Sequence, residues 1–71
     1  MIDTKHLDNW FTYHPPTEAQ KEAYRAIREA AFAFAQTVID YTPPSADQSA
    51  AIRHIREAVM TANAAIACGG Q

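Results

Sequence analysis

Residues 41–48 of the chain read YTPPSADQ, and this stretch decides the fold. Two consecutive prolines cannot continue a helix, because proline lacks the N–H donor and its ring clashes with the preceding turn. Ser45, followed three residues later by Gln48, fits the capping box that begins a helix. One helix therefore ends and another begins within a few residues, which predicts an antiparallel hairpin.

Both arms of this hairpin carry their own boundary signals. Thr17 and Gln20 form a first capping box directly after Pro15 and Pro16, so a long helix is predicted over 17–41. The second helix is predicted over 45–68, where a pair of glycines at 69–70 ends it. Residues 1–16 are predicted to form an N-terminal arm or a short helix. We therefore expect one all-α domain over 1–71.

Apolar residues recur at alternating spacings of three and four along both helices, as in a seam that two helices bury against each other. Phe32 and Ile39 lie on a different face from this seam, and a hairpin of this size has a thin core. We therefore expect the chain to form a homo-oligomer. The predicted seam consists of Tyr24, Ile27, Ala31, Phe34, Val38 and Tyr41 in the first helix and Ile52, Ile55, Val59, Ala62 and Ile66 in the second.

Composition excludes several classes of protein. The formal net charge of -2 argues against a protein that coats long DNA or RNA, because such proteins carry a basic face. Cys68 is the single cysteine, so no intramolecular disulfide is predicted. The start of the chain shows no secretory signal, and the longest apolar run, 30–35, is too short to span a membrane. We expect a cytoplasmic protein with no membrane partner.

The sequence contains no pattern of an enzyme or a metal protein. It has no HExxH motif, no cysteine pair and no glycine-rich phosphate loop. A metal site needs three or four converging ligands, and Cys68 and the three histidines do not have such a spacing. No catalytic residue, metal site or cofactor is predicted.

The segment 11–16, FTYHPP, is the first candidate binding element. Phe11 and Tyr13 offer aromatic faces, His14 offers a ring nitrogen, and the two prolines stiffen the backbone. Such a set suits a flat, polar ligand. The alternative is that Tyr13 and His14 only pack the arm onto the hairpin.

Arginines and one asparagine supply the remaining candidates. Arg25 and Arg28 lie three residues apart, hence on one helix face, and a guanidinium binds a phosphodiester bidentately. The alternative is an ordinary surface ion pair, since glutamates lie at helical distance from Arg25. Asn63 lies inside the second helix among alanines, where it would either hydrogen-bond across an interface or contact a ligand edge.

Two motifs together resemble a known family. FxYHPP at 11–16 and AVMxANAAIA at 58–67 are similar to the small helical hairpin domain of phage-encoded cyclic-nucleotide sponges of the anti-CBASS and anti-Thoeris type. The resemblance runs from about Phe11 to Ala67. It implies a hexamer that sequesters cyclic nucleotide immune signals without cleaving them, with Tyr13 stacking on a base and Arg28 contacting the ligand.

The resemblance also indicates which ligands to expect. It implies cyclic dinucleotides such as 3′,3′-cyclic GMP–AMP, with cyclic trinucleotides and cyclic ADP-ribose isomers as further candidates. Some members hold a trinucleotide through an arginine near the end of the second helix, and Cys68 stands at that position, which counts against the trinucleotide. The alternative function is a non-enzymatic interaction protein whose exposed helix face docks on a host or phage protein.

Overall fold

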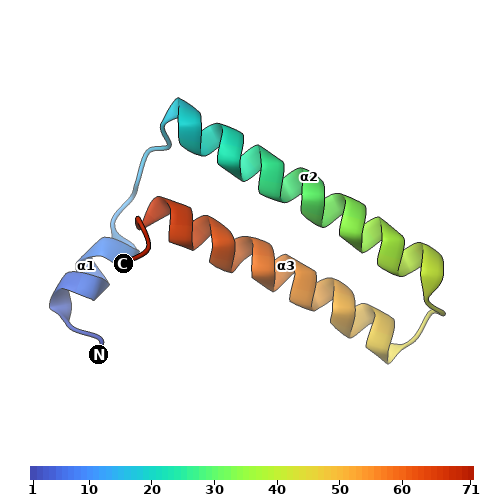
Figure 1. Ribbon diagram of the computed structural model, residues 1–71. Helices are drawn as coiled ribbons and strands as arrows, with labels where there is room; N and C mark the ends of the chain where they lie inside the picture. Colours follow the sequence, from blue (N-terminus) through green and yellow to red (C-terminus); the bar gives the residue numbers. More distant parts are fainter.

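Three helices and no strands make up the computed structural model, which describes all residues 1–71. Helix α1 spans Thr4–Phe11, α2 spans Glu18–Tyr41 and α3 spans Ala46–Ala67. Helices α2 and α3 run antiparallel as a hairpin, and α1 lies at its open end beside the C-terminus (Figure 1). The predicted all-helical hairpin is confirmed, and the predicted arm contains a true helix of eight residues.

The helix N-termini are set by local side-chain caps. At α2 the predicted capping box is confirmed, because the Gln20 N–H donates to Thr17 Oγ1 over 3.1 Å and the Thr17 N–H donates back to Gln20 Oε1 over 3.0 Å. At α3 the predicted box forms only in half. Ser45 Oγ accepts from the Gln48 N–H over 3.1 Å, whereas the Gln48 amide donates to the Thr42 carbonyl over 3.1 Å. Gln48 thus closes the turn between the two helices.

Helix α3 ends just before the two glycines, as the sequence predicted. The Gly70 N–H donates to the Ala65 carbonyl over 2.9 Å, and the Gly69 N–H donates to the Ile66 carbonyl over 3.3 Å. These two bonds form the Schellman motif, which needs a left-handed residue after the cap. Gly69 has a φ of 66°, a conformation that L side chains disfavour.

Polar side chains attach α1 and the start of α2 to the end of α3. The Asn9 amide donates to the Cys68 carbonyl over 3.1 Å, the Trp10 indole N–H donates to the Gln71 carbonyl over 2.9 Å, and the Gln20 amide donates to the Ile66 carbonyl over 3.3 Å. Carbonyls at a helix C-terminus have no partner within the helix. The bonds from Asn9 and Trp10 fix α1 at the open end of the hairpin, and the bond from Gln20 adds a second donor to a carbonyl of the last turn of α3.

Two residues of the predicted seam are not in it. Phe34 and Tyr41 are 60% and 84% exposed, whereas Ala35 and Val38 are half-buried. A strict spacing of three and four has a period of 3.5 residues, and a straight helix of 3.6 residues per turn drifts about 20° from it in each heptad. Over 24 residues this drift moves Phe34 to the rim of the seam and brings Ala35 into it.

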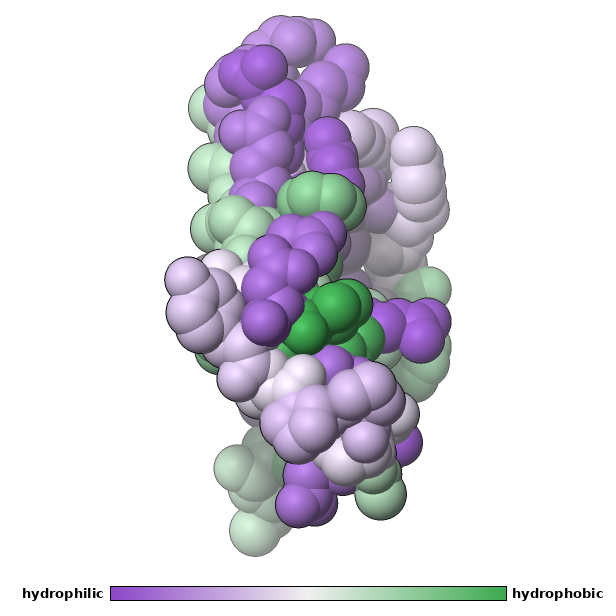
Figure 2. Space-filling model, turned by 90° about the vertical axis from the view of Figure 1, so that its right-hand side faces the viewer, coloured by the Kyte–Doolittle hydropathy of each residue, from purple (hydrophilic) through white to green (hydrophobic).

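The hairpin is a single layer of helices. Its extents are 44 × 29 × 15 Å, so it is little thicker than one helix with its side chains, about 10–12 Å. No residue is fully buried. The accessible surface is 5665 Å², whereas a folded monomer of 7.9 kDa is expected to expose about 4,400 Å². Strongly hydrophobic side chains reach the surface at the α2–α3 connection (Figure 2).

Candidate functional site

Phe11 and Tyr13 stand at the surface near the open end of the hairpin. Phe11 is the last residue of α1 and is 84% exposed, and Tyr13 follows in the extended segment before α2 and is 81% exposed. The two prolines at 15 and 16 lie between Tyr13 and the cap of α2. The phenol ring is therefore carried on a short, stiff segment and offers both of its faces to a ligand.

His14 is already engaged within the chain. Its Nε2 lies 2.6 Å from the backbone carbonyl of Asn9, and because a carbonyl only accepts, Nε2 donates this hydrogen bond. The Asn9 side chain in turn holds the Cys68 carbonyl. His14 therefore ties the extended segment to α1 and fixes where the neighbouring Tyr13 projects.

The arginines differ in their partners. Arg25 Nη2 lies 2.5 Å from Glu22 Oε2, so the predicted surface ion pair is present there. Glu18 and Lys21 form a second ion pair. Asp3 and Glu57 lie beside the rings of His6 and His54, which are cationic only when protonated. Arg28, Arg53 and Arg56 are left without a carboxylate partner, which keeps their charges available for an anion.

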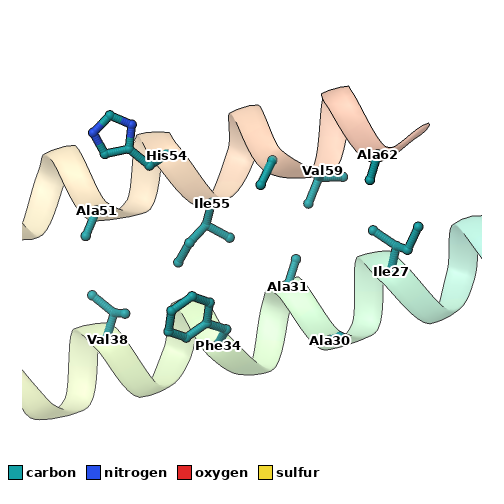
Figure 3. A pocket seen from close by; sticks show the side chains of 11 residues that line it. Ile27, Ala30, Ala31, Phe34, Val38, Ala51, His54, Ile55, Val59 and Ala62 are labelled. Carbon is teal, nitrogen blue, oxygen red and sulfur yellow. The ribbon is translucent and has the colours of Figure 1, made fainter. Parts of the chain in front are cut away.

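Two grooves follow the hairpin, one on each side of the seam. The first, which we term the apolar groove, has a volume of about 690 Å³, and Phe34 lines it from α2 and Ile55 from α3 (Figure 3). His54 is the single polar residue among its lining side chains. They are Ile27, Ala30, Ala31, Phe34, Val38, Ala51, His54, Ile55, Ala58, Val59 and Ala62.

The second groove, which we term the arginine groove, is smaller and carries two cations. Arg28 lines it from α2 and Arg56 from α3, and its volume is about 410 Å³. Phe32, which is 72% exposed, and Met60, which is 62% exposed, stand on its walls. The lining residues are Arg28, Ala31, Phe32, Ala35, Ile52, Ile55, Arg56, Val59 and Met60.

Asn63 lies on α3 and is half-buried, and it lines neither groove. Its Oδ1 is buried and has no hydrogen-bond partner. A buried acceptor without a partner is unfavourable by about 1–3 kcal/mol. The prediction that this side chain serves a contact beyond its own helix stays open, because no donor within the chain meets it.

The predicted site residues form two separate groups. Phe11, Tyr13 and His14 lie together at the open end, whereas Arg28 lies ten residues into α2 in the arginine groove. No groove of the chain contains both Tyr13 and Arg28.

Sequence reasoning did not predict that Arg56 lines the same groove as Arg28. The signal was present, because residues 25–30 read RAIREA and residues 53–58 read RHIREA. The repeat places an arginine at the same position of each helix. The antiparallel hairpin brings these two arginines into one groove.

The structure contains neither a metal-binding cluster nor a membrane-spanning helix. No cluster of three or more His, Cys, Asp or Glu side chains gathers closely enough to hold a metal ion. None of the helices has the length and apolar character needed to cross a membrane.

Comparison with known proteins places the chain in one family. A family model described as Acb2/Tad1, hairpin domain, matches residues 3–67. No curated protein and no solved structure matches the chain.

Proposed function

Since the match covers residues 3–67, the chain belongs to the Acb2/Tad1 hairpin-domain family of anti-CBASS and anti-Thoeris sponges, and we propose that it binds and sequesters a cyclic nucleotide immune signal. The family is one of binding sponges, so the proposal includes no cleavage. The signal is made inside the infected bacterium, and the proposed place of action is therefore the bacterial cytoplasm. The family match is the observation that carries this proposal.

The exposed groups fit the chemistry of a cyclic dinucleotide, which has two flat bases and two anionic phosphodiesters. Tyr13, 81% exposed, is the proposed stacking residue, and stacking of a base on an aromatic ring contributes about 1–3 kcal/mol. Arg28, which has no carboxylate partner, is proposed to hold a phosphodiester through charge-assisted hydrogen bonds. His14 supports Tyr13 through its bond to Asn9.

The other predicted residues have smaller proposed roles. Arg25 is held by Glu22 and would reach the ligand only after breaking that pair. Phe11, 84% exposed, would extend the aromatic surface beside Tyr13. Asn63 would reach a ligand or a second copy only by donating from its side-chain amide N–H group, since its oxygen is occluded within the chain.

We propose that a second copy of the chain completes the site. Tyr13 and Arg28 share no groove of one chain, so a pocket between copies would let Tyr13 of one copy face Arg28 of another. The surface supports association, because the chain exposes roughly 1,250 Å² more than a compact monomer of its mass. The apolar groove is the proposed self-association face, and the family resemblance implies a hexamer.

The proposed ligand is 3′,3′-cyclic GMP–AMP or a related cyclic dinucleotide. Cyclic ADP-ribose isomers remain candidates, because they also combine a base with anionic phosphates. A cyclic trinucleotide fits less well. Cys68, which stands where the family's trinucleotide-binding arginine is expected, has no guanidinium to hold a third phosphodiester and lies among the contacts that anchor α1.

Calorimetric titration of the purified chain with a panel of these nucleotides tests the function. The proposal predicts saturable binding of at least one cyclic dinucleotide. Binding of none would leave the alternative, a helical interaction protein, which the exposed apolar groove favours. In that case we would expect the chain to form a complex with a host or phage protein that covers Phe34, and that protein would be its ligand.

A further inference from the structure

We propose that Arg56 is a second ligand-binding residue, which acts with Arg28 as a pair of guanidinium clamps on the two phosphodiesters of a cyclic dinucleotide in the arginine groove. The proposal rests on the proposed function and extends it, because it assigns to the site a residue from α3. It depends on three observations of the groove: its internal symmetry, its free charges and its apolar walls.

The first observation is an internal repeat. Residues 27–30 and 55–58 both read IREA, and each copy is followed by an apolar pair that ends in Phe32 or Met60. Residues four apart lie on one face of a helix. Each wall of the groove therefore presents an arginine and, one turn further along its helix, a large apolar side chain.

The antiparallel hairpin turns this repeat into an approximate two-fold arrangement. Phe32 lies one turn from Arg28 toward the α2–α3 connection, whereas Met60 lies one turn from Arg56 toward the open end, because the helices run in opposite directions. The groove thus alternates charged and apolar groups about a local two-fold axis. A cyclic dinucleotide is itself nearly two-fold symmetric, with two phosphodiesters and two bases, so the two patterns match.

The second observation is that both guanidiniums lack a carboxylate partner. The nearest acidic residues in sequence, Glu29 and Glu57, each follow an arginine by one position, and neighbours in a helix do not face each other. The carboxylate of Glu57 lies beside another side chain, with its Oε2 atom 3.6 Å from Nδ1 of His54. Arg28 and Arg56 line the same groove from opposite helices, so an anion bound in it would meet a positive charge from each wall.

The third observation concerns the walls. Phe32 and Met60 are 72% and 62% exposed, although both are large and apolar. Flat bases packed on them would cover this surface, and aromatic rings and thioethers both make favourable contacts with such faces. In this arrangement Tyr13 from a second copy closes the groove over the ligand.

Arg53 provides a matched control. It carries the same charge on the same helix as Arg56, has no carboxylate partner and lines neither groove. Replacing either arginine by alanine removes one positive charge and improves helix propensity. A difference between the two variants therefore reports the groove and not the net charge.

The experiment titrates 3′,3′-cyclic GMP–AMP into the full chain and into the variants Arg56→Ala, Arg56→Lys and Arg53→Ala, and measures their sedimentation. We expect Arg56→Ala to weaken binding by at least ~10-fold, because charge-assisted hydrogen bonds are lost. The affinity of Arg53→Ala should stay within about three-fold of that of the parent chain, since a screened surface charge outside the groove contributes little. The affinity of Arg56→Lys should lie between those of Arg56→Ala and the parent chain, because an ammonium keeps the charge but cannot form the bidentate hydrogen bonds of a guanidinium.

The possible failures are distinguishable. If the parent chain binds the nucleotide and the Arg56→Ala and Arg53→Ala variants bind it with equal affinity, the clamp is wrong and the proposed function stands. If Arg56→Ala loses both affinity and assembly, Arg56 belongs to the contact between copies and the clamp is again wrong. If the parent chain binds no cyclic dinucleotide, the proposed function fails first and the clamp falls with it.

Discussion

Replacing Phe34 with alanine tests whether the apolar groove holds the copies of the chain together. Phe34 is 60% exposed in the single chain and lines the apolar groove from α2 (Figure 3). With about 200 Å² for a phenylalanine side chain, roughly 120 Å² remains to be covered by a second copy. At about 25 cal/mol per Å², this corresponds to ~3 kcal/mol for each ring that becomes buried.

A loss of that size is large enough to measure. It weakens association by on the order of 100-fold, so an assembly that is stable at micromolar concentration should dissociate measurably in a sedimentation series. Alanine has the higher helix propensity, so the helix content by circular dichroism should be unchanged. The change in sedimentation would then report association and not unfolding.

Tyr41→Ala is the matched control for this experiment. Tyr41 is 84% exposed, more than Phe34, but lies at the end of α2 in neither groove. Its replacement should leave association unchanged. Equal association constants for the parent and Phe34→Ala would show that the apolar groove is not the contact, and a parent chain that sediments near 7.9 kDa would refute the inference from exposed surface altogether.

Three further substitutions test the site and the helix ends. Tyr13→Ala should weaken binding of 3′,3′-cyclic GMP–AMP by about 1–3 kcal/mol in calorimetry without changing sedimentation, and equal affinity would remove Tyr13 from the site. Gly69→Ala should lower the free energy of unfolding by about 1–2 kcal/mol in thermal melts, because alanine disfavours the φ of 66°; an unchanged midpoint would show that the Schellman motif contributes nothing. Thr17→Ala should lower the free energy of unfolding by about 1 kcal/mol in the same melts, because the α2 cap is lost. Thr37 lies in the interior of the same helix, and Thr37→Ala should leave this free energy unchanged.

Local signals in the sequence predicted the helices well. The caps at Thr17 and Ser45, the prolines at 43 and 44 and the glycines after Cys68 each act through the backbone of a few residues, so their effect does not depend on distant packing. The sequence predicted α1 less clearly. Its cap pairs Asp3 with His6, whereas the usual capping box has glutamate or glutamine at the second position.

The seam and the site depend on information that the local sequence pattern does not contain. Whether Phe34 or Ala35 faces α3 depends on the helix period accumulated over several turns, which the assumed spacing misjudged. The pairing of Arg28 with Arg56 depends on the register of the hairpin. The internal repeat indicates this pairing only once the helices are known to run antiparallel.

The central claim is that the chain holds a cyclic nucleotide without changing it, and recovery of the ligand tests this most directly. The chain is saturated with 3′,3′-cyclic GMP–AMP, separated from free ligand and then denatured by heat, and the released nucleotide is quantified by chromatography. We predict release of intact cyclic nucleotide in a fixed ratio to the protein. Linear or cleaved product, or the absence of any retained nucleotide, would contradict sequestration.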